Sequence, residues 1–131
     1  MKTEEKENEM HRRMSITIIN TGVEEVWTRS DSDLKHGKWM DDSPPVSIPI
    51  NGTAEVNSEK QTGAAYGTTG GIEFISNIKP NNTLTIEWDK PYGSGATTCT
   101  ASVSGADYNA KVENKDFQQS YASCDVVITT K

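Results

Sequence analysis

The sequence is poor in aromatic, cysteine and histidine residues, and it has no long apolar run. Aromatic side chains make up 7% of its 131 residues, and it contains two cysteines and two histidines. No apolar run approaches the roughly 20 residues of a membrane-spanning helix, and nothing near the N-terminus resembles the apolar segment of a signal peptide. We therefore predict a protein made without a signal peptide, held in the cytoplasm or in a crystal or inclusion of the producing cell.

The chain is also short of positive charge, with 13 lysine and arginine residues against 19 aspartate and glutamate residues. Its first fourteen residues are neutral overall, so the net charge of −6 lies on the rest of the chain. An acidic body is a poor ligand for a phosphate backbone or for strongly anionic lipid. This charge argues against nucleic acid as a partner and favours a neutral, zwitterionic or cationic one.

The polar residues show no pattern typical of a catalytic or metal-binding site. Neither His11 nor His36 has a cysteine, serine or carboxylate at a spacing that makes a catalytic relay or a metal site. The glycine cluster "GTTGG" at 67–71 has no following lysine and opens into a strand, unlike a phosphate-binding loop. We therefore expect no enzyme, metal or cofactor. Cys99 and Cys124 could pair as a disulfide or remain two buried reduced thiols.

What the sequence does contain is alternation of apolar and polar residues in short segments separated by turn residues. In "TLTIEW" at 83–88, for example, Leu84, Ile86 and Trp88 fall on one face. Short strands at such regular spacing predict an all-β fold, a single-domain antiparallel β-sandwich of two packed sheets. Pro49 either confines its segment to a sheet edge or prevents it from forming a strand. The predicted strands are 15–20, 25–28, 46–50, 53–57, 71–76, 83–88, 98–104, 107–113 and 123–130.

The remaining segments are predicted to lie outside strands. Residues 1–13 are charged and lack apolar periodicity, so we expect a flexible tail there, followed by the sandwich domain at 14–131. The stretch "DSDLKHGKW" at 31–39 is expected to be a polar loop. The acidic pairs at 24–25 and 41–42 are expected to be solvated.

The segment "TIEWDKPYGSG" at 85–95 places two of the few aromatic residues where a strand ends. Pro91 lacks an N–H and so ends the ladder, and Asp89 can set the turn by hydrogen bonding to nearby backbone. Tyr92 would then lie on a loop at one end of the sandwich, where a tyrosine suits a water–lipid interface. Trp88 is in phase with the apolar residues of its strand, so it fits either the core or the rim of a site.

Three segments in this order resemble the aegerolysins, small β-sandwich proteins of fungi and bacteria. They are "GKWMDD" at 37–42, "GTTGGIEF" at 67–74 and "IEWDKPYGS" at 86–94. The third is the most specific, and the resemblance covers about residues 14–131. Lys90 stands where fungal members carry a cysteine, and Tyr66 where sphingolipid-binding members often carry a glutamate. The sequence therefore looks more like the bacterial branch, which includes small insecticidal proteins.

The resemblance implies an actinoporin-like or aegerolysin-like sandwich that binds membrane lipid and is not an enzyme. It further implies the small component of a binary pore-forming toxin, insecticidal in some bacterial pairs. Such a component acts outside the producing cell with a larger protein partner, and it could form homo-oligomers on membranes. We predict a site for a zwitterionic, sphingolipid-like headgroup, with aromatic rings around its ammonium and a carboxylate nearby. The predicted site residues are Trp88, Tyr92, Tyr66, Trp39, Asp89 and Asp41.

A second class of function fits the same residues. Aromatic side chains on loops stack on sugars as readily as they contact lipid, so a module that binds a glycan or a protein receptor without membrane attack is the alternative. Binding to protein-free liposomes separates these two classes. The chain has no obvious long amphipathic segment to insert, so we expect weak or no lysis by this chain alone.

Overall fold

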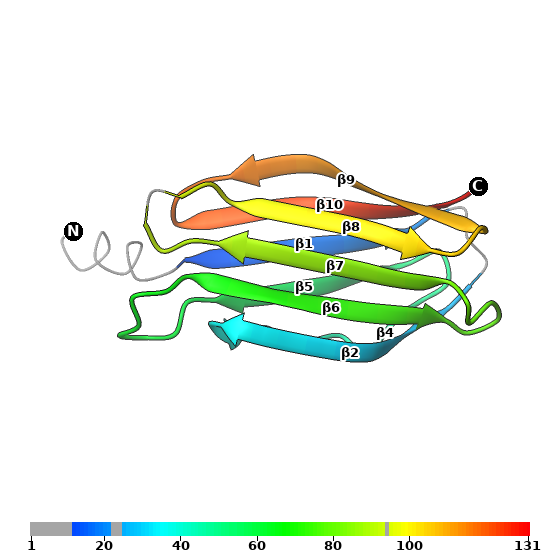
Figure 1. The fold of residues 1–131 in the computed structure, drawn as a ribbon, viewed down its shortest axis with the longest axis horizontal. Coiled ribbons are helices and arrows are strands. Elements are labelled where there is room, and N and C mark those ends of the chain that lie inside the picture. The colour runs from blue at the N-terminus through cyan, green and yellow to red at the C-terminus, as the bar shows by residue number, and fades with distance from the viewer. Residues whose placement is uncertain (1–11, 22–24, 94) are drawn as a thin grey trace.

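The computed structural model describes residues 12–21, 25–93 and 95–131, and it shows two five-stranded sheets packed face to face (Figure 1). This confirms the predicted β-sandwich. Most of the predicted tail lies outside the described residues, and the first strand begins at Arg13. The strands are β1 (Arg13–Asn20), β2 (Trp27–His36), β3 (Lys38–Trp39), β4 (Ser47–Ile48), β5 (Thr53–Glu59), β6 (Thr68–Ser76), β7 (Thr83–Lys90), β8 (Thr98–Ser104), β9 (Tyr108–Phe117) and β10 (Tyr121–Thr130).

The two sheets differ in how their strands run. The first sheet has the order β3-β5-β1-β10-β9 and the second has β4-β2-β6-β7-β8. β1 and β10 pair in parallel, from Arg13 opposite Tyr121 to Asn20 opposite Ile128, whereas the sequence predicted antiparallel pairing. The first and last strands of the domain lie side by side here, and the chain between them forms the long connection that parallel neighbours need.

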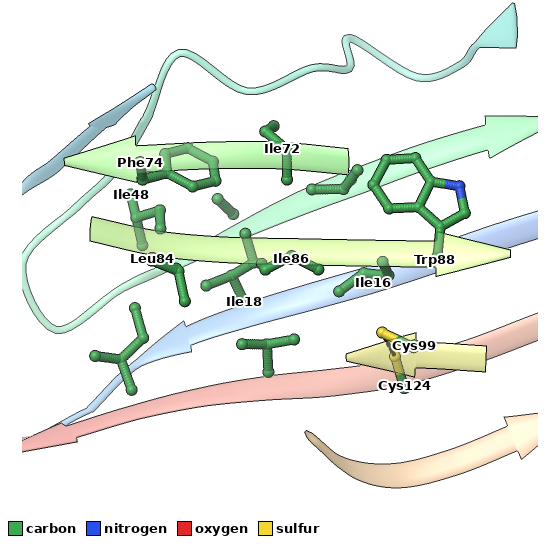
Figure 2. Packing of buried hydrophobic residues seen from close by; sticks show 14 of the residues in the cluster. Ile16, Ile18, Ile48, Ile72, Phe74, Leu84, Ile86, Trp88, Cys99 and Cys124 are labelled. Atoms are coloured by element: carbon green, nitrogen blue, oxygen red, sulfur yellow. Dashed lines mark hydrogen bonds between the residues drawn. The ribbon is translucent and has the colours of Figure 1, made fainter. Parts of the chain in front are cut away.

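The core lies between the sheets and is formed by every second residue of the long strands (Figure 2). In β7, Leu84 and Ile86 are fully buried and Trp88 is 3% exposed, while the residues between them are more exposed. Burying one such apolar side chain contributes about 1.5–3 kcal/mol. The alternation that predicted the strands therefore also predicts which residues form the core.

Three expectations, two about strand boundaries and one about an acidic side chain, are wrong. Residues 31–36 are the second half of β2, because an edge strand tolerates polar side chains on the face that it turns to solvent. Residues 68–71 begin β6; a Cβ at Gly70 would lie 2.6 Å from the carbonyl oxygen of Asp33, so this close approach requires glycine. Glu25 is 2% exposed rather than solvated, and its Oε1 accepts a hydrogen bond from the backbone N–H of Ile78 at 2.9 Å.

The loops gather at two ends of the sandwich (Figure 1). The loops after β5, β7 and β9 lie at one end, drawn on the left. We call it the tyrosine end, because the exposed Tyr66, Tyr92 and Tyr121 lie there. The opposite end carries the loops after β6 and β8, and we call it the asparagine end after its buried Asn20 and Asn82. Within the described ranges, no helix is long and apolar enough to cross a membrane.

Candidate functional site

The tyrosine end contains a cleft of about 440 Å³, which we call the tyrosine cleft. Its walls come from the end of β2, the loop after β5 and the chain around the end of β7. It brings together three of the six predicted site residues, Tyr66, Tyr92 and Asp89. Tyr66 is 60% exposed and Tyr92 is 40% exposed. An exposed aromatic surface and a carboxylate therefore meet in one hollow.

Two contacts hold Tyr66 in place, one at its ring and one at the residue that follows it. Its ring stacks on His36, with ring centres 4.1 Å apart and planes 7° from parallel. At the next residue, Gly67, a Cβ would lie 1.8 Å from the carbonyl oxygen of Lys90, so only glycine lets this loop approach the end of β7 so closely. The position of His36 beside Tyr66 was not predicted, because residues 31–39 were expected to form a loop.

Tyr92 already contacts two of the protein's own cations. The guanidinium of Arg12 lies 5.1 Å from the ring centre, and the Nζ of Lys60 lies 5.2 Å from it. The Nε of Arg12 also donates a hydrogen bond to the Tyr92 carbonyl at 3.0 Å. An external cation would therefore meet repulsion at Tyr92, and Tyr66 is the better aromatic surface for an external ammonium.

Asp89 supplies the negative charge of the cleft, and its Oδ1 accepts a hydrogen bond from the Thr69 hydroxyl at 2.8 Å. It is one of five carboxylates on the outer face of the second sheet, around a trough of about 570 Å³. No ion pair within the described part of the chain involves any of them. We call this surface the acidic face: Asp31, Asp33, Glu73, Glu87 and Asp89. Its field attracts cationic groups toward the neighbouring cleft.

The other three predicted site residues do not line the tyrosine cleft. Trp88 is a core residue that also lines the trough of the acidic face, and its indole N–H donates to the Thr68 hydroxyl at 3.2 Å. Trp39 packs edge-on against Trp88, with ring centres 5.9 Å apart. Asp41 forms an ion pair with Arg13. Of the two positions left open for Trp88, the structure shows the core, because its strand turns it inward.

Sequence reasoning missed three buried cations at the tyrosine end. Arg12, Lys60 and Lys90 are 6%, 4% and 3% exposed. Lys90 continues the inward-facing row of β7, and this phase is a signal that the sequence contains. Its Nζ donates a hydrogen bond to the carbonyl of Gln119 at 2.7 Å. Burial, and secondly the positive charge of Arg12, lower the pKa of Lys90 below its ordinary value.

Cys99 and Cys124 face each other across the two sheets, with their sulfur atoms 3.2 Å apart (Figure 2). Both are buried, and no covalent bond joins them in the structure. The hydrogen bond that Cys124 donates lowers the pKa of the Cys99 thiol, whereas the same contact, together with burial, raises the pKa of Cys124. Whether the two form a disulfide stays a prediction.

The described ranges contain no group of three or more histidine, cysteine or acidic side chains that could hold a metal ion. The fold is a β-sandwich, and a cleft lined by aromatic side chains lies among the loops at one end. The family model described as Aegerolysin matches residues 11–131, so the chain belongs to the aegerolysin family. Aegerolysins are lipid-binding proteins that are not enzymes.

Similar proteins agree with this assignment. Asp-hemolysin of Aspergillus fumigatus is 28% identical over 93 residues, which are 62% of this chain and 65% of that relative. The match thus spans slightly less than two thirds of the length of this curated relative.

Three solved structures have the same fold. RahU in complex with a Tris molecule has a TM-score of 0.77 at 14% identity, covering 93% of this chain and 97% of its own. The lipid-binding protein Nakanori has a TM-score of 0.74 at 14% identity, covering 98% and 79%. IP-1A from Alcaligenes faecalis has a TM-score of 0.73 at 18% identity, covering 98% and 97%. At these identities the structures establish the fold alone.

Proposed function

We propose that this protein binds a zwitterionic, sphingolipid-like membrane lipid through the tyrosine cleft. The observation that carries the proposal is the meeting of Tyr66, Tyr92 and Asp89 in one hollow at a loop end. Tyrosine suits the boundary between water and lipid, because its ring is apolar and its hydroxyl can stay hydrated. Three exposed tyrosines at one end give the molecule a defined side to turn toward a membrane.

In this proposal the headgroup ammonium lies against the exposed ring of Tyr66, with Asp89 as the nearby anion. A cation–π contact of this kind contributes about 0.5–2 kcal/mol. The other four carboxylates of the acidic face raise the local concentration of cationic groups without adding a direct contact. Two relatives support a lipid or amine ligand, since Nakanori is a lipid-binding protein and RahU was solved with Tris.

We further propose that the protein is the small, insecticidal-type component of a binary pore-forming toxin. It binds the target membrane outside the producing cell, assembles there, and a larger protein partner supplies most of the inserted structure. The family resemblance and the name of Asp-hemolysin support membrane attack. The purified chain alone should release little dye from liposomes, and strong release by the chain alone would remove the need for a partner.

The test of lipid binding is co-sedimentation with liposomes of phosphatidylcholine, sphingomyelin with cholesterol, and ceramide phosphoethanolamine. We expect selective pelleting, weakened about tenfold by Tyr66→Ala, in line with the loss of one cation–π contact. The matched control is Ile78→Ser, because Ile78 is 72% exposed at the asparagine end. It should leave binding unchanged.

Equal binding by Tyr66→Ala and the wild type would show that the cleft is not the headgroup site. Pelleting with none of the liposomes would favour the glycan- or receptor-binding alternative. The stacked rings of His36 and Tyr66, with Asp89 as a hydrogen-bond acceptor, form a flat polar surface that suits a sugar ring. A glycan panel probed with the same Tyr66→Ala variant would then test that class.

A further inference from the structure

The interior of the sandwich changes from apolar to cationic at the tyrosine end. Arg12 and Lys60 lie on neighbouring segments of the first sheet, where the Lys60 N–H donates to the Arg12 carbonyl at 3.0 Å. Lys90 comes from β7 of the second sheet. Cations from both sheets therefore converge, although the chain as a whole carries a charge of −6. Burying like charges together costs free energy unless an anion compensates them.

The two lysines retain unused hydrogen-bonding capacity. An ammonium has three donors. The Nζ of Lys90 donates to the Gln119 carbonyl at 2.7 Å, and that of Lys60 donates to the Gln61 carbonyl at 3.1 Å and faces the Tyr92 ring. Among the described residues, neither lysine forms an ion pair with a carboxylate.

The buried carboxylate next in the chain, Glu59, forms an ion pair with Lys38 at 3.6 Å. Lys38 therefore shares the negative charge of Glu59. The positive charge at Lys60 and Lys90 is met by carbonyl dipoles and a ring in the described part of the chain.

A hollow of about 370 Å³ lies beside Lys90, between the loop after β7 and the turn from β9 to β10. We call it the Lys90 pocket. Its lining residues include Gly93, Gly95, Thr97 and Gln119, and none of the described residues that line it is acidic. The side chains of Thr97 and Gln119 can donate hydrogen bonds. A cation, neutral donors and an uncharged wall form a suitable environment for a small anion.

We propose that the Lys90 pocket binds a phosphate-type oxyanion, with Lys90 as the cation that receives it and Thr97 and Gln119 as further donors. The oxyanion would accept the unused donors of Lys90 in short, charge-assisted hydrogen bonds and would offset the repulsion from Arg12. Its source is either free phosphate or the phosphate of a lipid headgroup. The lipid source rests on the proposed function. It requires the two hollows to be neighbours, and Gly93 lines both the Lys90 pocket and the tyrosine cleft.

The first experiment titrates inorganic phosphate into the full chain, with chloride adjusted to keep the ionic strength constant, and follows backbone amides by NMR. We expect saturable shifts at Gly93, Gly95 and Thr97 in the wild type. Lys90→Met should weaken the binding at least about tenfold, the value of a hydrogen bond to a charged group. The matched control is Lys111→Met, which removes the same charge from an exposed position paired with Glu113 and should bind as the wild type does.

Thr97→Val provides an independent test if Lys90→Met fails to fold, because Thr97 is only partly buried. It should weaken phosphate binding about tenfold through the loss of one hydrogen bond to the charged oxyanion. The absence of saturable shifts in the wild type overturns the proposal. Equal phosphate affinity in folded Lys90→Met and the wild type also overturns it.

The second experiment identifies the source of the oxyanion by co-sedimentation with phosphatidylcholine vesicles. Weaker pelleting of Lys90→Met than of Lys111→Met supports a headgroup phosphate. Unchanged pelleting, with phosphate binding lost in Lys90→Met, supports free phosphate as the ligand. If the wild type binds phosphate but pellets with none of the vesicles in the lipid panel, the oxyanion site stands and the proposed lipid function fails.

Discussion

Both ends of the sandwich bury polar side chains, but the two ends compensate them in different ways. At the asparagine end, the amide of Asn82 donates to Asp107 at 2.7 Å, and Lys79 pairs with the same carboxylate at 3.5 Å. At the tyrosine end, the described contacts of Lys60 and Lys90 are with backbone carbonyls and one tyrosine ring. Among the described residues, Lys79 is therefore paired with a carboxylate, whereas Lys60 and Lys90 are not.

Under the proposed function, this difference separates a structural network from a recognition surface. The hydrogen bond from Asn82, opposed in part by burial and then aided by Lys79, lowers the pKa of Asp107 and so favours its charged form. A network whose members satisfy one another stabilises the fold and needs no ligand. A buried charge without a counter-charge reduces stability, and such sites persist where binding depends on them.

The largest expected effect comes from breaking the asparagine end. Asn82 is fully buried, and its side chain donates to Asp107 and to the Lys79 carbonyl and accepts from the Asp107 N–H. Asn82→Ala leaves these groups without partners, so we expect a loss of about 2–4 kcal/mol in the free energy of unfolding. Urea denaturation measures it. A loss below about 1 kcal/mol would show that water replaces the network at little cost.

The second largest effect is expected from a disulfide that would link the two sheets in the half of the molecule near the tyrosine end. Cys99 lies opposite Trp88 in the second sheet, and Cys124 lies in β10 of the first. With the sulfur atoms 3.2 Å apart, mild oxidation should form a disulfide. Closing this loop should raise the free energy of unfolding by about 3 kcal/mol.

Thiol titration under denaturing conditions and urea denaturation check this outcome, and Cys124→Ala should show no response to the oxidant. Two titratable thiols after oxidation of the wild type would show that the sheets hold the sulfur atoms apart. A stabilised protein that still binds liposomes would show that the tyrosine end recognises lipid without the sheets separating.

Much of the fold could be predicted from the sequence, because a strand that buries one face shows its period directly. The strand at 98–104 was predicted with the boundaries that β8 has. The second half of β2 was missed, since a polar edge strand has the composition of a loop. The parallel pairing of β1 with β10 was missed because it joins residues from opposite ends of the chain, which local patterns do not report.

The candidate site was predictable in part for a similar reason. Tyr66 and Asp89 come together because β6 and β7 are neighbours, with Thr69 directly opposite Asp89. A strand-by-strand reading could have found Lys90, which is in phase with Trp88. It could not have shown that Arg12 and Lys60 lie at the same end of the sandwich interior as Lys90, because that depends on how the two sheets are aligned with each other.

The smallest expected effect concerns the stability of the tyrosine end without a ligand. In chloride buffer, Lys90→Met should change the free energy of unfolding by less than about 1 kcal/mol. It loses the hydrogen bond to Gln119 but also removes a buried cation near Arg12, while methionine keeps the apolar stem. If the charge of Lys90 only stabilised the fold, Lys90→Met would instead clearly lower the free energy of unfolding.

The pH dependence of the free energy of unfolding tests whether the charge of Lys90 is compensated in the folded protein. The pKa of Lys90 is lowered in the folded state, so between that value and its ordinary value of 10.5 the unfolded chain binds more protons. Stability contributed by this group therefore rises with pH through that window. Urea denaturation at increasing alkaline pH should show the rise in the wild type relative to Lys90→Met, and phosphate should reduce the rise by favouring the charged lysine. Parallel profiles for the two proteins would mean that the charge of Lys90 is already compensated, and the two ends would then no longer differ.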